Sequence, residues 1–171
     1  MGIDKALIRY HGEPQVRRLA AMMEGVASPV YVSVRRSQLE EPGFQGLRLL
    51  CDQAEDIGPL AGLLAAFAHE PESAWLVTAV DLPWISAGTL QRLLDARDPA
   101  CFATAYRIPQ TDRPEPVCAI YEPAILPVLE RARDRRRYSL MLLKDVPLKL
   151  LDPLDERELR GVNEPGEFRG A

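Results

Sequence analysis

The feature that most constrains the fold is a series of short apolar runs, rich in β-branched residues, that alternate with helical patterns. Runs of this length and composition predict buried strands. The expected strands cover residues 30–34, 47–51, 75–80 and 101–106, and an alternating run at 148–151 predicts an edge strand. Helical spacing predicts helices near residues 14–23, 59–67, 86–94, 123–129 and 139–143. Because strands that alternate with helices form parallel βαβ units, the sequence predicts a three-layer, mostly parallel, Rossmann-like α/β sheet with helices on both faces.

The length of 171 residues predicts a single domain over residues 1–171, since no linker long enough to separate two domains occurs. The proline-rich segment 109–116 is expected to be a mobile loop. The net charge of −4 does not indicate a surface for nucleic acid or membrane. The arginine-rich run 131–137 is better explained as a solvated helix end than as a binding patch.

Cysteine and histidine usage indicates neither disulfides nor a structural metal site. Cys51, Cys101 and Cys118 lie far apart, and no Cys/His ligand spacing occurs. Reduced thiols are typical of cytoplasmic proteins, and no apolar run approaches the length of a membrane span. We therefore expect a cytoplasmic protein with small-molecule ligands.

Two aspartates directly follow expected strands, at the edge of the sheet where α/β proteins bind ligands. Asp81 follows the run 75–80, and Asp52 follows the run 47–51. A lone carboxylate in this position suits Mg²⁺, which takes one or two carboxylates together with substrate phosphates. Position alone equally allows Asp81 to cap the turn before the helix that begins near Ser86.

Gly58 and Gly62 flank the start of an apolar helix, whose free N–H groups could face a ligand. These glycines could equally serve only to pack the helix closely on the sheet. Lys5, taken alone, is most simply a surface lysine. The sequence contains neither a GxGxxG nor a GxxxxGK[ST] phosphate loop, and it contains neither a GxSxG turn nor a plausible Cys/His pair. The motifs that would indicate a dehydrogenase or a hydrolase are therefore absent from the sequence.

Five motifs occur together in one order and cover almost the whole chain. They are MGIDKAL with GEP behind it, GPLAG, VDLP, RPEPVCA and VNEPGEF, at residues 1–14, 58–62, 80–83, 113–119 and 162–168. In this set and order the sequence resembles the molybdenum cofactor guanylyltransferase family, within the nucleotidyltransferases that activate sugars and alcohols.

The resemblance assigns roles to individual residues. Lys5 resembles the family's nucleotide-phosphate lysine, and Asp81 resembles its Mg²⁺ carboxylate. Asp52 resembles the nucleotide-contacting aspartate ahead of GPLAG, and Ser33 falls where members can carry a nucleotide-contacting asparagine. Asn163 resembles the second asparagine of an Asn-x-Asn-Thr-Pro signature near the cofactor substrate, a region to which the resemblance also assigns Gly58 and Gly62.

The implied reaction is attack by the terminal phosphate of molybdopterin on the α-phosphorus of GTP, with Mg²⁺ present and release of pyrophosphate. GTP and molybdopterin are then the substrates, and molybdoenzyme-maturation proteins are candidate partners. Cytidylyl or sugar-phosphate transfer, and a catalytically impaired binding module, are the alternatives.

Family members begin with a strand and a Leu-Ala-Gly-Gly-type loop ahead of the methionine at which this sequence starts. In this kind of sheet that first strand is central, so a chain without it should have an opened sheet and a groove at the nucleotide site. We expect translation to start upstream of Met1, and the chain from Met1 onward to transfer nucleotide poorly.

Overall fold

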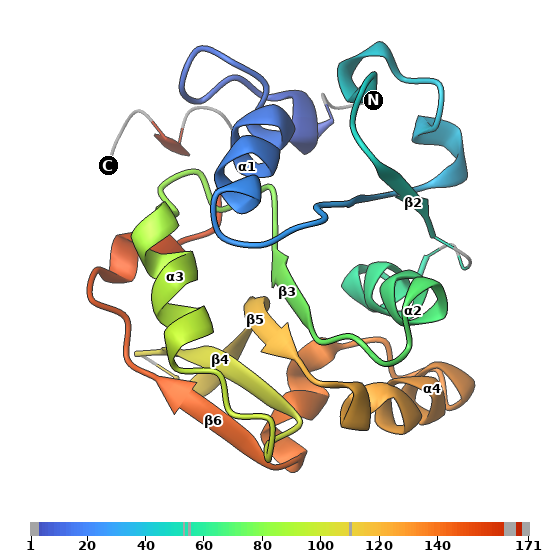
Figure 1. Cartoon of the computed structure of the whole chain (residues 1–171), viewed down its shortest axis with the longest axis vertical. Coiled ribbons are helices and arrows are strands. Elements are labelled where there is room, and N and C mark those ends of the chain that lie inside the picture. Colours follow the sequence, from blue (N-terminus) through green and yellow to red (C-terminus); the bar gives the residue numbers. More distant parts are fainter. Residues whose placement is uncertain (1–3, 53, 55, 110, 163–166, 169–171) are drawn as a thin grey trace.

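The computed structural model describes residues 4–52, 54, 56–109, 111–162 and 167–168 (Figure 1). The strands are β1 (Val32–Val34), β2 (Leu49–Cys51), β3 (Trp75–Thr78), β4 (Ala103–Ile108), β5 (Arg113–Tyr121) and β6 (Leu148–Leu151). The α-helices are α1 (Gln15–Glu24), α2 (Pro59–His69), α3 (Ala87–Asp95) and α4 (Leu126–Asp134). Short 3₁₀ helices are η1 (Lys5–Leu7), η2 (Arg36–Gln38), η3 (Pro42–Phe44), η4 (Pro123–Ile125), η5 (Leu140–Asp145) and η6 (Glu156–Leu159).

The described strands form two separate sheets. β1 and β2 pair in parallel, and the second sheet has the strand order β3-β5-β4-β6. β5 runs antiparallel to both β3 and β4, whereas β4 and β6 are parallel. The expected α/β class is confirmed, and β6 is an edge strand as predicted. The pairing is mixed rather than mostly parallel, because β5 enters the sheet between β3 and β4 in the opposite direction.

The expectation of a loop over residues 109–116 is wrong for its second half, since Arg113–Pro116 belongs to β5. Two prolines in this stretch argued against a strand. The pairing of β5 with β4 shifts register between Ala105 and Arg107, and Pro114 lies opposite Arg107 at this irregularity. A proline lacks the N–H that a regular ladder needs, and irregular positions are where strands accept it.

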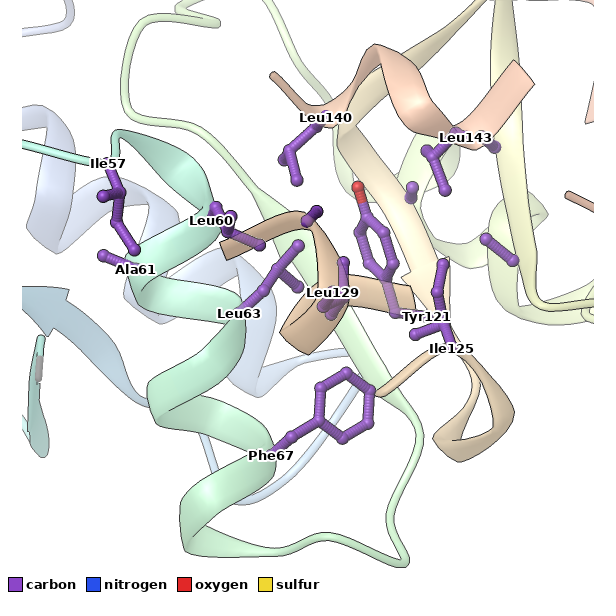
Figure 2. Close-up of a cluster of buried hydrophobic side chains, with 14 residues drawn as sticks. Ile57, Leu60, Ala61, Leu63, Phe67, Tyr121, Ile125, Leu129, Leu140 and Leu143 are labelled. Carbon is purple, nitrogen blue, oxygen red and sulfur yellow. The ribbon is translucent and has the colours of Figure 1, made fainter. Parts of the chain in front are cut away.

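The four-stranded sheet has a hydrophobic layer on each face because successive residues of β5 point to opposite sides. Ala119 and Tyr121 pack with α2 and α4 (Figure 2), whereas Cys118 and Ile120 pack with residues of α1 and α3. The three layers expected from the sequence are thus present around this sheet.

Helix starts follow the residues that the sequence singled out. Ser86 Oγ accepts a hydrogen bond from the Thr89 N–H at 3.2 Å, so Ser86 caps α3. Pro59 begins α2 directly after Gly58, whose φ of 59° lies in the left-handed region that favours glycine. The helix expected after Ser139 is present as the 3₁₀ helix η5.

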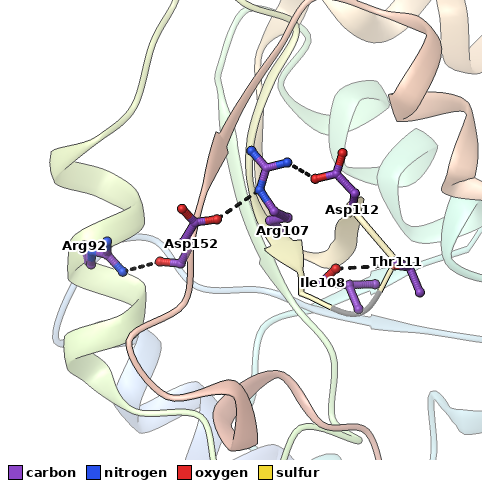
Figure 3. Close-up of polar contacts among 6 residues, drawn as sticks. All are labelled: Arg92, Arg107, Ile108, Thr111, Asp112 and Asp152. Carbon is purple, nitrogen blue, oxygen red and sulfur yellow. Dashed lines mark hydrogen bonds and ion pairs between the residues drawn. The ribbon is translucent and has the colours of Figure 1, made fainter.

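The turn between β4 and β5 is tied to neighbouring elements by a polar network (Figure 3). The Arg107 guanidinium bonds to the Asp112 carboxylate in the turn and to Asp152 Oδ1 beyond β6, the latter at 2.9 Å. Arg92 of α3 donates to the carbonyl of the same Asp152 at 2.6 Å. These contacts fix the turn relative to α3 and to the end of β6.

A cleft of about 360 Å³ separates β1 from β3. No strand of the described residues pairs with the edges of β1 and β3 that border this cleft. The described residues therefore leave the sheet open between β1 and β3. None of the described helices is long and apolar enough to span a membrane.

Candidate functional site

Ser33 and Asp52 lie together at the carboxyl ends of β1 and β2. The parallel register aligns Val34 with Cys51, so the side chain of Asp52, the next residue, comes close to Ser33. Ser33 Oγ donates a hydrogen bond to Asp52 Oδ1 at 2.5 Å. Burial raises the pKa of the Asp52 carboxyl, and the Ser33 bond and the charge of Arg35 partly offset this rise. The two residues thus form a polar rim at one side of the cleft.

The two glycines of α2 have different structural roles. Gly58 supplies the left-handed backbone that starts the helix. A Cβ at Gly62 would lie 2.6 Å from Ser33 Oγ, so α2 can approach the Ser33–Asp52 pair this closely only with glycine there. Gly62 therefore packs the helix against the rim, and Gly58 starts the helix that follows β2 along the chain.

Asp81 follows β3 at the same edge of the molecule. The Ala79 N–H still bonds to the Val117 carbonyl at 2.9 Å, and the Asp81 carbonyl accepts from the Val162 N–H at 2.8 Å. A Cβ at Gly161 would lie 4.0 Å from Asp81 Oδ2, which places the carboxylate beside the segment that follows η6. Ser86 caps the following helix α3, as its position predicted.

Glu115 and Tyr10 share the surroundings of Asp81. Burial, with the Asp81 charge as a smaller cause, raises the pKa of the Glu115 carboxyl. Burial and the charges of Asp81 and Glu167 raise the pKa of the Tyr10 phenol. Further negative charge is thus unfavourable beside Asp81. A cation bound there would relieve the repulsion between the Asp81 and Glu115 carboxylates.

Glu115 belongs to the motif at residues 113–119 but has no role predicted from the sequence, because the prolines around it favour a loop. The apolar run of residues 117–121 does indicate a strand next to Glu115. The two prolines before it argue against extending that strand to Glu115.

Lys5 lies in η1, half-buried, beside the buried Ala6. Ala6, the neighbour of Lys5, belongs to a small apolar cluster with Val34, and Val80, the neighbour of Asp81, packs against it. The cluster lies near the carboxyl ends of β1 and β3. Asp52 and Asp81 lie beyond β2 and β3, where their positions after the strands predicted them, and Ser33 is hydrogen-bonded to Asp52.

Asn163 lies outside the described residues. Among the residues that are described, no group of three or more His, Cys, Asp or Glu side chains could hold a metal ion.

The layered α/β fold, with acidic residues beyond the carboxyl ends of its strands, is typical of a nucleotide-binding domain. Comparison of sequences agrees, since residues 1–148 match the family described as MobA-like NTP transferase domain. The chain belongs to this family, and the resemblance noted in the sequence is confirmed.

Curated relatives carry names from molybdenum cofactor synthesis. A molybdenum cofactor biosynthesis bifunctional protein of Synechocystis is 28% identical over 98% of this chain and 49% of its own length. A molybdenum cofactor guanylyltransferase of Xanthomonas euvesicatoria is 35% identical over 60% of this chain and 51% of its own length. The chain thus spans about half the length of these two relatives.

A solved structure has the same fold. The molybdopterin-guanine dinucleotide biosynthesis protein A of Archaeoglobus fulgidus superposes with a TM-score of 0.78, covering 99% of this chain and 89% of that one at 19% identity. At this identity the likeness concerns the fold alone.

Proposed function

We propose that this protein is a nucleotidyltransferase that moves GMP from GTP to the terminal phosphate of molybdopterin and releases pyrophosphate. The membership of the family and the names of the relatives support this reaction. The observation that carries the proposal is the position of Asp81, half-exposed directly beyond β3 and beside a second carboxylate, Glu115.

The chain's own residues would bind and orient the nucleotide. The Lys5 ammonium would offset the negative charge of the triphosphate as the α-phosphorus is attacked. Ser33 and Asp52 would contact the nucleoside at the rim, where their mutual hydrogen bond fixes the orientation of the carboxylate. We propose that Gly58 and Gly62, together with Asn163, border the molybdopterin side of the site. No covalent intermediate is required, because positioning and charge neutralisation lower the barrier.

Proteins of this family are generally Mg²⁺-dependent. We propose that Asp81 holds the ion and that Glu115 supports it, because this pair concentrates negative charge at the rim. The ion supplies charge neutralisation between the protein and the phosphates.

Calorimetry of GTP binding, with and without Mg²⁺, tests the assignment of the metal ion to Asp81. We expect binding that requires Mg²⁺ and that weakens at least about ten-fold in Asp81→Asn, since the substitution removes the carboxylate charge. Glu72→Gln is the matched control, because Glu72 is exposed and precedes the opposite end of β3. Equal GTP affinity in Asp81→Asn and in Glu72→Gln would refute the assignment of the metal to Asp81.

Pyrophosphate release with molybdopterin as acceptor tests the reaction itself. Lys5→Ala should lower turnover by about a hundred-fold or more, as removal of a charge-stabilising group commonly does. The exposed Lys144→Ala is the control. A panel of nucleoside triphosphates decides between guanylyl and cytidylyl transfer, and faster release from CTP than from GTP would overturn the choice of base.

A further inference from the structure

Two side chains of α1 bond to the main chain of residues 82–85, the loop that leads into α3 (Figure 1). Gln15 Nε2 donates a hydrogen bond to the Leu82 carbonyl at 3.3 Å. One turn later on the same helix, Arg18 Nη2 donates to the Ile85 carbonyl at 3.0 Å. The helix therefore holds the first and the last residue of this loop.

A third side chain, from the segment that precedes α1, bonds to the middle of the 82–85 loop. His11 Nε2 lies 2.8 Å from the Pro83 carbonyl, and because a carbonyl only accepts, the ring nitrogen is the donor. Directly before the loop, the Asp81 carbonyl accepts from the Val162 N–H at 2.8 Å. The main chain is thus held at Asp81 itself and at three of the four residues that follow it.

These contacts place polar groups of α1 where an apolar face would pack at a lower cost. Gln15 is fully buried, whereas the other buried residues of α1 are apolar. Gln15 Oε1 and Arg18 Nη1 are buried with no hydrogen-bond partner among the described residues. Burial lowers the pKa of the Arg18 guanidinium, and the charge of Glu13 partly offsets this effect. Packing of the helix alone does not require a buried glutamine and a desolvated arginine.

We propose that His11, Gln15 and Arg18 act together as a clamp, which fixes the 82–85 loop and so the orientation of the carboxylate that precedes it. The inference rests on the proposed role of Asp81 in holding Mg²⁺. Metal ligands commonly depend on neighbouring groups that orient them, and here those groups act through the main chain. The three clamp residues are therefore positioning residues, whose role is to limit movement of the loop.

Matched variants of α1 separate the clamp from the rest of the helix. Arg18→Ala removes a donor to the loop, whereas Arg17→Ala removes a neighbouring arginine that donates to the Gln45 carbonyl at 2.8 Å. Arg18→Lys keeps a positively charged donor and should restore most of what Arg18→Ala loses. Gln15→Met is a second clamp variant, which keeps the length of the side chain. It also removes a buried oxygen without a partner, so urea unfolding should change little.

Backbone order in the free protein tests the clamp without any ligand. NMR order parameters of the amides in the 82–85 loop should fall in Arg18→Ala and in Gln15→Met, from about 0.85, which is typical of a rigid backbone, toward about 0.6. They should stay unchanged in Arg17→Ala. Unchanged order of the loop in both clamp variants would overturn the inference.

Mg²⁺ titration of GTP binding, followed by calorimetry, tests the effect of the clamp on Asp81. In Arg18→Ala, the Mg²⁺ concentration for half-maximal GTP binding should rise at least about ten-fold, because the metal ligand loses its supporting contacts. The affinity for GTP at saturating Mg²⁺ should change less. In an Asp81→Asn background, Arg18→Ala should add nothing further, since the charge that the clamp orients is already gone. Additive losses in the double variant would show a merely structural role and overturn the inference.

The outcomes separate this inference from the proposed function. If GTP binding is absent or does not depend on Asp81, the assignment of the metal fails, and the inference fails with it. If Asp81→Asn weakens Mg²⁺-dependent binding but both clamp variants titrate like Arg17→Ala, the assignment of the metal stands and the inference alone is wrong.

Discussion

Gly62→Ala tests the close approach of α2 to the rim. The structure predicts that this substitution lowers the free energy of unfolding. In an open helix position, alanine in place of glycine stabilises by up to about 1 kcal/mol. Here the new Cβ would lie 2.6 Å from Ser33 Oγ and 3.1 Å from Ser33 Cβ, well inside ordinary contact. Ser33 can move its oxygen away only by giving up its 2.5 Å bond to Asp52.

The cost of this overlap exceeds the gain in helix propensity. Overpacking commonly costs about 1–3 kcal/mol, and a lost hydrogen bond to a charged group adds about 1.5–3 kcal/mol in buried settings, less at this half-exposed rim. We therefore expect a net loss of about 1–3 kcal/mol, which lowers the melting temperature by about 2–4 °C per kcal/mol in a chain of this size.

Urea unfolding at neutral pH measures the change, and Gly88→Ala in α3 is the matched control. A Cβ at Gly88 would meet only Ser86 Oγ at 3.6 Å, an ordinary contact, so this variant should be neutral or stabilised. In a Ser33→Gly background, the loss caused by Gly62→Ala should disappear. Stabilisation of Gly62→Ala equal to that of Gly88→Ala would refute the reasoning.

Three other substitutions probe different parts of the structure. Burial raises the pKa of Asp52, so the folded state holds this proton more tightly than the unfolded state, and stability falls as pH rises from 3.8 through the folded pKa. Asp52→Asn should therefore be more stable than the parent at pH 7, with the gain vanishing below about pH 4 in urea titrations. Arg97→Ala removes the partner bonded to both carboxylate oxygens of Glu122, whose side chain is only 4% exposed, and should cost about 1–3 kcal/mol, which the double variant with Glu122→Gln should partly restore. Phe67→Ala opens the core drawn in Figure 2 and should cost about 3–5 kcal/mol, whereas Leu154→Ala, at 86% exposure, should change stability by less than about 0.5 kcal/mol in the same assay.

Local patterns predicted most of the elements because each carried its own physical signal. Ser86 supplies the cap that its position indicated, and the apolar run of α2 is buried as its composition required. The rim was predictable for the same reason, since a residue that follows a buried strand must lie at the edge of the sheet. Asp52 and Asp81 were found in this way before any contact was known.

Contacts between distant segments were not predictable from such signals. The antiparallel direction of β5 depends on its pairing with β3 and β4, and its prolines argued locally against a strand. Glu115 has no role predicted from the sequence, because its contact with the surroundings of Asp81 depends on the pairing of β5 with β3. The tight fit of Gly62 against Ser33 likewise depends on the crossing of α2 over β1, which involves residues far apart in the chain.

Ser33 belongs both to the rim and to the cleft. Its side chain is bonded to Asp52, whereas its main-chain groups face the gap beside β3. A ligand that contacted the Ser33 main chain would therefore also restrict the orientation of the Asp52 carboxylate, which couples the cleft to the proposed nucleotide site.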